Sequence, residues 1–145
     1  MNAYDEYMRG IVKPMREELV QNGFTELTTA EEVQETMDSL KGTALIVINS
    51  VCGCAAGLAR PAVREALSAS AEKPDHLLTV FAGQDKEATA MMRDFFPEVP
   101  PSSPSIAVWR DGSLANFIPR EEIENTDMEQ IKDHLTGVLE QVCKK

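Results

Sequence analysis

Two cysteines separated by a single residue, Cys52 and Cys54, follow directly after an apolar, β-branched run over 44–51. In an α/β protein this position is typical of the turn from a buried strand into a helix. The thiolate is the reactive form of cysteine, and a helix N-terminus stabilises negative charge, so a cysteine at such a turn tends to have a lowered pKa. The pair therefore points first to thiol chemistry.

Thiol exchange would give the two cysteines unequal roles. The attacking thiolate must be exposed and aimed outward, and Cys52, nearer the strand end, fits that role better. Gly53 removes side-chain bulk and lets the backbone approach an incoming disulfide. A Cys52–Cys54 disulfide would close a small ring, whereas disulfides prefer Cα separations of ~4.4–6.8 Å. We expect such a bond to be strained and easily reduced, which favours exchange or isomerisation over strong reduction.

Two other interpretations of the pair stay open, metal binding and inert packing. Tetrahedral zinc sites usually need four protein ligands, and His76, His134 and Cys143 are scattered over different predicted elements. We therefore predict no metal site. Cys143 lies near the end of the last predicted helix, where we expect a partly buried or frayed terminal thiol with no catalytic role.

Composition narrows the setting of this chemistry. The 145 residues, 43% of them apolar, are enough for one domain over 1–145. The net charge of −10 repels phosphate backbones and anionic lipid, so neither nucleic acid nor a membrane is an expected partner. The chain has no basic start followed by an apolar stretch, and no run of ~18 apolar residues. We expect a cytoplasmic protein, and in a reducing cytosol a close cysteine pair is more often catalytic or metal-binding than structural.

The first half of the chain reads as two helices, a strand and a third helix. Apolar spacing predicts a helix over about 4–19, which Pro14 would kink or divide, and Thr29 with Glu32 forms a capping-box pattern for the next helix. A strand follows at about 44–49. The Ala-rich segment over about 54–70 predicts a helix that is kinked at Pro61.

The second half reads as a strand, a helix, a hairpin and a final helix. The strand covers about 77–82, and Asp85 is the predicted N-cap of the helix after it. A loop rich in Pro and Ser over 97–105 leads to two short strands that flank Asp111-Gly112, a strong hairpin signal. Thr126 with Glu129 resembles a second capping box before the last helix.

This order of elements predicts an α/β fold with a central mixed sheet and helices on both faces. It is the order of a thioredoxin-like domain, here with an N-terminal helical extension. That fold places its active thiols at the end of the first core strand, beside a cis-proline loop that precedes the hairpin. Ser103-Pro104 stands where that loop would be, so we predict a cis bond there and assign Ser103, Pro104 and Gly53 to substrate binding.

Longer stretches of the sequence resemble one family in particular. The run over 49–61, which contains the cysteine pair, is similar to the bacilliredoxin family, and so are the segments over 80–89, 101–105 and 117–120 and the N-terminal stretch over 4–16. The similarity spans nearly the whole chain. These motifs are much longer than a bare two-cysteine pattern.

The resemblance implies a cytosolic protein that removes the small thiol bacillithiol from S-bacillithiolated protein cysteines. Cys52 matches the family's nucleophile, which takes the small thiol onto itself, and Cys54 matches the second cysteine, which could resolve the adduct. Gly53 and Pro104 match positions that line the site. No tightly bound cofactor is implied, and the expected partners are proteins carrying mixed disulfides and a separate reductant. Two alternatives remain, protein disulfide isomerase activity and a non-catalytic peptide- or metal-binding module.

Overall fold

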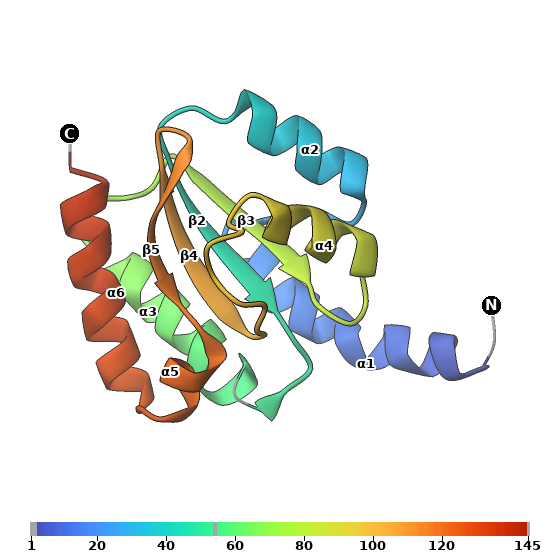
Figure 1. Ribbon diagram of the computed structural model, residues 1–145. Coiled ribbons are helices and arrows are strands. Elements are labelled where there is room, and N and C mark those ends of the chain that lie inside the picture. Colours follow the sequence, from blue (N-terminus) through green and yellow to red (C-terminus); the bar gives the residue numbers. More distant parts are fainter. Residues whose placement is uncertain (1–2, 54, 145) are drawn as a thin grey trace.

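The computed structural model describes residues 3–53 and 55–144, which form a mixed five-stranded sheet with helices on both faces (Figure 1). This arrangement confirms the predicted architecture. The elements in chain order are α1 (Ala3–Val20), β1 (Thr25–Glu26), α2 (Ala30–Ser39), β2 (Thr43–Asn49), the π-helix η1 (Ala55–Ala59), α3 (Arg60–Ala69), β3 (His76–Phe81), α4 (Lys86–Asp94), β4 (Ser105–Arg110), β5 (Ser113–Ile118), α5 (Arg120–Glu124) and α6 (Met128–Val142).

The strands lie in the order β1-β3-β2-β4-β5, so β2 is central. It pairs in parallel with β3 and antiparallel with β4, with Ile48 opposite Ser105. The β4–β5 hairpin turns at Asp111 and Gly112, whose φ angles are 49° and 86°. This turn was predicted from the Asp-Gly pair, because both residues tolerate positive φ.

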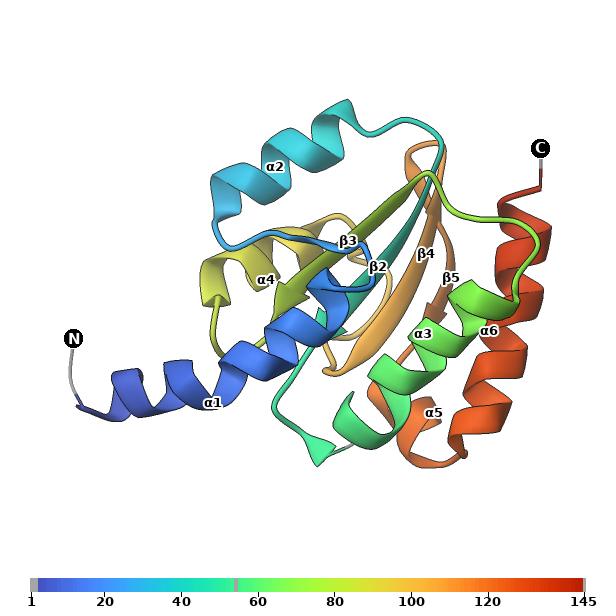
Figure 2. The ribbon, with the colours of Figure 1, turned by 180° about the vertical axis from the view of Figure 1, so that it is seen from behind.

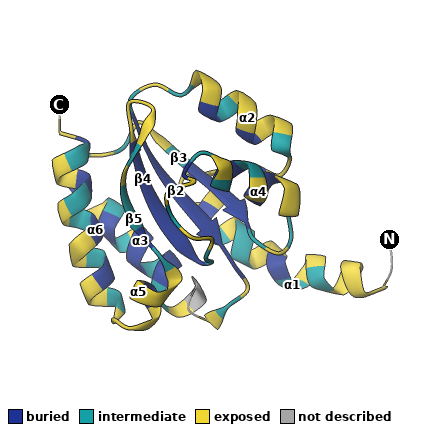
Figure 3. Ribbon diagram, viewed as in Figure 1, coloured by how far each residue is buried: buried dark blue, intermediate teal, exposed yellow. Residues whose placement is uncertain are grey.

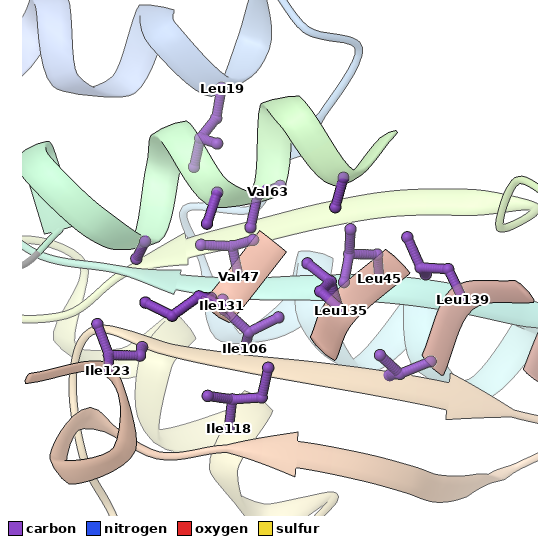
Figure 4. Close-up of a cluster of buried hydrophobic side chains, with 14 of the residues drawn as sticks. Leu19, Leu45, Val47, Val63, Ile106, Ile118, Ile123, Ile131, Leu135 and Leu139 are labelled. Atoms are coloured by element: carbon purple, nitrogen blue, oxygen red, sulfur yellow. The ribbon is translucent and has the colours of Figure 1, made fainter. Parts of the chain in front are cut away.

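Both faces of the inner strands β2, β3 and β4 are largely buried, as their dark colour in Figure 3 shows, whereas the edge strand β5 is partly exposed. All seven residues of β2 are buried, and its side chains alternate between the two faces. Leu45 and Val47 point into a core shared with α3 and α6, which Figure 4 shows together with Leu19 of α1. Ile46 and Ile48 point into the opposite core, under α2 and α4. A continuous apolar run is what a strand covered on both faces requires.

Helix α1 extends past the edge of the sheet, as the view from behind shows (Figure 2). Its first turns carry the exposed side chains of Tyr4 and Tyr7, whereas Val12 and Leu19 further along are buried. Pro14 lies inside α1 but does not divide it. The prediction that the whole chain is one domain with a helical extension stays a prediction.

The helix expected at 54–70 begins differently from the prediction. Residues 55–59 form the π-helix η1, and α3 starts at Arg60 with Pro61 in its first turn. Pro61 thus lies just after the junction of η1 and α3, where the bonding pattern changes from π-helical to α-helical and the N–H that proline lacks is most easily done without. The expected kink at an interior Pro61 is therefore replaced by a change of helix type just before it.

Two predicted caps were also wrong in their side chains. The capping box at Thr126 and Glu129 does not form, because Asp127 caps α6 by accepting a hydrogen bond from the Gln130 N–H at 2.9 Å. The Thr126 hydroxyl instead donates to the Glu122 carbonyl at the end of α5. Asp85 occupies the N-cap position of α4 but makes no capping bond there, because its carboxylate pairs with Arg16 at 2.6 Å.

Candidate functional site

The turn after β2 presents Cys52, which is half-buried. Cys52 lies three residues after Asn49, the last residue of β2. The Cys52 N–H donates to the Ser50 hydroxyl at 3.0 Å, and the Ser50 N–H donates to the Asn49 side-chain oxygen at 2.9 Å. The side chains of Asn49 and Ser50 therefore hold the backbone of the turn that carries Cys52, the predicted nucleophile.

The predicted second cysteine, Cys54, lies outside the described residues. Gly53 is exposed, and a Cβ added to it would meet nothing within 4 Å. The protein's own packing therefore does not require glycine at this position. The space beside the Gly53 backbone is open, which leaves room for an incoming disulfide. That Gly53 faces such a disulfide stays a prediction.

The chain then enters η1, the π-helical turn that leads into α3. Single π-helical turns of this kind are frequent at functional sites. The first residue after it, Arg60, turns inward and is only 3% exposed. The helical turn that follows Cys52 thus places the charged side chain of Arg60 in the protein interior.

Arg60 also contacts the turn over residues 49–52, which carries Cys52. Its Nη1 donates to the Asn49 Oδ1 at 2.7 Å and to the Ser50 carbonyl at 3.2 Å, and its Nε donates to the Glu18 carboxylate at 2.9 Å. Arg60 was assigned no role from the sequence. The signal available in the sequence was a lone charge within an Ala-rich stretch, and the structure shows that Ala59 and Ala62 beside it are fully buried.

The loop before β4 lies at the same end of the sheet. Ile48 near the end of β2 is opposite Ser105 at the start of β4, so the segment after β2 and the segment before β4 leave the sheet together. The Ser103–Pro104 bond is cis, which confirms that prediction, and Pro104 is buried. The structure thus brings Ser103 and Pro104 to the sheet edge where Cys52 lies.

Two arginines anchor the proline loop. Arg93 of α4 donates to the Ser102 carbonyl at 3.1 Å, and burial lowers the pKa of this arginine. Arg120 donates to the Ser103 carbonyl at 3.3 Å and pairs with Glu124 at 2.5 Å. Residues of this loop and of α5 line an open hollow of about 650 Å³. Neither arginine was singled out from the sequence, because their partner is a loop carbonyl that carries no sequence signal.

The other candidate ligands lie away from this turn. Cys143 is 3% exposed at the end of α6, and burial raises the pKa of its thiol, partly opposed by a hydrogen bond with Thr43. Cys143 contacts Thr43, the first residue of β2, whereas Cys52 lies just after the last residue of this strand. The two cysteines are therefore at opposite ends of a strand about 20 Å long. His76 starts β3 beside Ala44, also at the far end, and His134 is exposed on α6.

Two kinds of feature are absent from residues 3–53 and 55–144. No group of three or more His, Cys, Asp or Glu side chains in this part of the chain could hold a metal ion. No helix within it is long and apolar enough to cross a membrane.

Comparison with known proteins places this geometry in a family. A family described as disulphide isomerase matches residues 7–143. A bacilliredoxin from Bacillus cereus is 56% identical over 142 residues, which cover 98% of this chain and 99% of that protein. A bacilliredoxin from Geobacillus kaustophilus is 54% identical over 141 residues, 97% of each chain.

A solved structure supports the fold independently of sequence. Thioredoxin O2 from Arabidopsis thaliana in its oxidized state superimposes with a TM-score of 0.54 at 15% identity, covering 86% of this chain and 97% of that one. This likeness confirms the predicted thioredoxin-like fold. The chain therefore belongs to the bacilliredoxin family and is a thiol–disulfide oxidoreductase with a thioredoxin-like fold.

Proposed function

We propose that this protein removes bacillithiol from S-bacillithiolated protein cysteines, with Cys52 as the nucleophile and Cys54 as the resolving thiol. The observation that carries the proposal is the 56% identity, over 98% of the chain, to a protein named bacilliredoxin. The half-buried position of Cys52 at a strand end supports the role of nucleophile, since thiol exchange needs an accessible sulfur.

The proposed reaction has two exchange steps. The Cys52 thiolate attacks the bacillithiol sulfur of the mixed disulfide, so the target cysteine leaves as a thiolate and a Cys52–bacillithiol disulfide forms. The Cys54 thiolate then attacks the Cys52 sulfur, which releases bacillithiol as a thiolate and leaves a Cys52–Cys54 disulfide. A separate reductant, a small thiol or a protein dithiol, supplies two electrons to restore both cysteines. No tightly bound cofactor takes part.

The surroundings of Cys52 support a role for the proline loop in binding the modified protein. Ser103 and Pro104 lie at the same sheet edge, and Arg120 holds the Ser103 carbonyl at 3.3 Å. Gly53 leaves space for a disulfide to approach. We therefore assign Gly53, Ser103 and Pro104 to substrate contact. We place the reaction in the cytoplasm, where thiols are kept reduced.

The test uses a variant that stops after the first step. Cys54→Ser protein is mixed with a bacillithiolated target protein, and intact masses of both are followed. We expect the target to lose the mass of bacillithiol while the variant gains the same adduct, which peptide mapping locates on Cys52. If the target stays modified and no adduct appears, the proposed function is wrong.

A matched glutathionylated target identifies the small thiol. Preference for the bacillithiolated target by about tenfold or more in rate would support bacillithiol as the native thiol. Equal rates with both targets would contradict that specificity while leaving general de-thiolation intact. Cys143→Ser protein serves as the control for the third cysteine.

Disulfide isomerisation is the second candidate, because the matching family is described as disulphide isomerase. An isomerase would need Cys52 to attack protein disulfides and release them again without net oxidation. Recovery of activity from a scrambled disulfide-bonded protein tests this directly. Recovery that persists in Cys54→Ser protein would favour isomerisation, which needs only the attacking thiol.

A further inference from the structure

Arg60 is the most deeply buried charged side chain near the candidate site, with 3% of its surface exposed. Its surroundings on α3 are apolar, since Ala62, Val63 and Ala66 on the same helix are fully buried. Burying a charge is costly unless it is paired and hydrogen-bonded, so an aliphatic residue would be the simpler choice for packing alone. The guanidinium of Arg60 therefore serves to make hydrogen bonds that an apolar side chain could not make.

The contacts of Arg60 show which groups these hydrogen bonds hold. The planar guanidinium offers several N–H donors in a fixed arrangement, and Arg60 uses them on groups from two separate elements. Toward the candidate site it holds the Asn49 side chain at 2.7 Å and the Ser50 carbonyl at 3.2 Å. Toward the N-terminus it holds Glu18 of α1 at 2.9 Å. One side chain therefore joins α1 to the end of β2.

The connection continues from both partners. The Asn49 side chain donates to the Met15 carbonyl of α1 at 3.3 Å and accepts from the Ser50 N–H at 2.9 Å. The Ser50 hydroxyl then accepts from the Cys52 N–H at 3.0 Å. A chain of hydrogen bonds thus runs from α1 through Arg60, Asn49 and Ser50 to the backbone of Cys52.

We propose that Arg60 is a positioning residue that fixes the 49–52 turn, and through it the Cys52 nucleophile, against helix α1. Arg60 acts through Asn49 and Ser50 and does not itself react. The inference rests on the proposed function, because it takes Cys52 to be the nucleophile whose placement matters. It also gives α1 a role at the site that its distance in sequence does not suggest.

The test compares Arg60→Met with Arg64→Met. Both arginines lie on α3 and approach the same Glu18 carboxylate, but Arg64 is 45% exposed and its nearest Glu18 oxygen is 3.9 Å away. Two readouts are taken, the rate of bacillithiol transfer to Cys52 and hydrogen exchange at the Ser50 and Cys52 amides. The melting temperature and exchange at the β2 amides over 44–48 report on global stability.

In Arg60→Met protein we expect both readouts to change. Transfer should slow by about ten- to a hundredfold, as expected from the loss of hydrogen bonds to a charged group, and the Ser50 and Cys52 amides should exchange faster by a similar factor. The β2 amides should change much less, because their partners are β3 and β4. Arg64→Met should leave both readouts within about twofold of the wild type.

Several outcomes would overturn the inference. Equal transfer rates in the two variants would do so, and so would acceleration of the β2 amides as large as that of Ser50 and Cys52, because a general loss of stability would explain it. If Arg60→Met fails to fold, Arg60→Lys decides, since lysine keeps the charge but not the planar donor set. Lysine protein with wild-type transfer and amide exchange would contradict positioning; a slower transfer with local acceleration would support it.

Failure of the two proposals can be distinguished. If wild-type protein accepts no bacillithiol, the proposed function is wrong, and the amide exchange of Ser50 and Cys52 still decides whether Arg60 fixes the turn. If wild-type protein accepts bacillithiol and Arg60→Met does so at an unchanged rate, the proposed function stands and the positioning role is wrong.

Discussion

Cys52 and Cys143 are the same residue type and lie near the two ends of β2, yet they differ in exposure and in the contacts around them. Cys52 is half-buried in a turn whose backbone is held by Asn49 and Ser50. Cys143 is buried at the end of α6, packed in the core that includes Leu135 and Leu139. Thiolate attack needs an accessible and ionised sulfur, so only the first environment suits exchange.

The comparison shows that the position of a cysteine relative to the strands and helices controls the reactivity of its thiol more than the residue type does. Burial raises the pKa of the Cys143 thiol, which keeps it protonated and unreactive at neutral pH. Cys52 instead follows a strand that ends at the sheet edge and precedes a helical turn. The same α/β topology therefore provides one site for a reactive thiol and another for a packing thiol.

The largest expected difference between the two cysteines is in activity. Cys52→Ser should abolish small-thiol transfer, a loss of more than about a thousandfold, because a hydroxyl is a poor nucleophile toward disulfides. Cys143→Ser should leave the rate within about twofold, since no described contact links Cys143 to the turn. Transfer rates of both variants, measured by intact mass, check this. A large loss in Cys143→Ser protein with unchanged melting temperature would break the comparison.

The second effect concerns the packing that encloses Cys143. Leu135 is fully buried in the same core, and Leu135→Ala should lower the free energy of unfolding by about 2–5 kcal/mol through lost contacts and a cavity. Glu140→Ala, at an exposed position of α6, is the control and should change stability by less than about 0.5 kcal/mol. Denaturant unfolding gives both values. Equal stabilities would mean that this core does not enclose the helix end.

The third effect is the accessibility of the thiols in the folded protein. Iodoacetamide at about pH 8 should alkylate Cys52 at least about tenfold faster than Cys143, because burial hides the second sulfur and raises its pKa. Peptide mapping after timed quenching measures both rates. In Leu135→Ala protein the Cys143 rate should rise while the Cys52 rate stays the same. Similar rates in the wild type would show that the end of α6 frays open.

The smallest effect is a dependence of stability on high pH. A thiol whose pKa is raised in the folded state contributes stability below its unfolded pKa, and this contribution is lost as pH rises through the folded pKa. Between about pH 8 and about pH 10 the wild type should therefore lose more stability than Cys143→Ala protein, by no more than a few degrees in melting temperature. Parallel melting curves of the two proteins across this range would contradict the raised pKa.

Local signals in the sequence predicted those parts of the fold that depend on neighbouring residues. The capping box at Thr29 and Glu32 forms, and hydrogen bonds from Thr28 and Thr29 lower the pKa of Glu32. The continuous apolar run of β2 and the Asp111-Gly112 hairpin also formed as predicted. The capping box and the hairpin turn have their partners within a few residues, and the apolar run of β2 is itself continuous, so in each case the physical cause is visible in a short stretch of sequence.

The Asp85 cap failed because a residue distant in sequence takes its side chain. Asp85 does not cap α4, because Arg16 of α1 takes its carboxylate, and Glu26 and Asp85 together raise the pKa of Arg16 although burial alone would lower it. Arg16 also lies over the Phe81 ring at 5.0 Å. The strand β1, which carries Glu26, was missed because two residues show no alternating pattern and only the pairing with β3 defines the strand. The short helix α5 was missed as well.

The sequence by itself determined the cysteine pair and the strand before it, because residue type and short-range spacing fix a turn and a strand, and the order of elements over the whole chain predicted the cis-proline loop through the thioredoxin-like fold. The tertiary structure alone decided that Arg60 is buried and joins the turn after β2, at Asn49 and Ser50, to Glu18 of α1. These contacts join residues that are from 10 to 42 positions apart for Arg60 alone. Chain topology sets such distances, and no local pattern in the sequence encodes them.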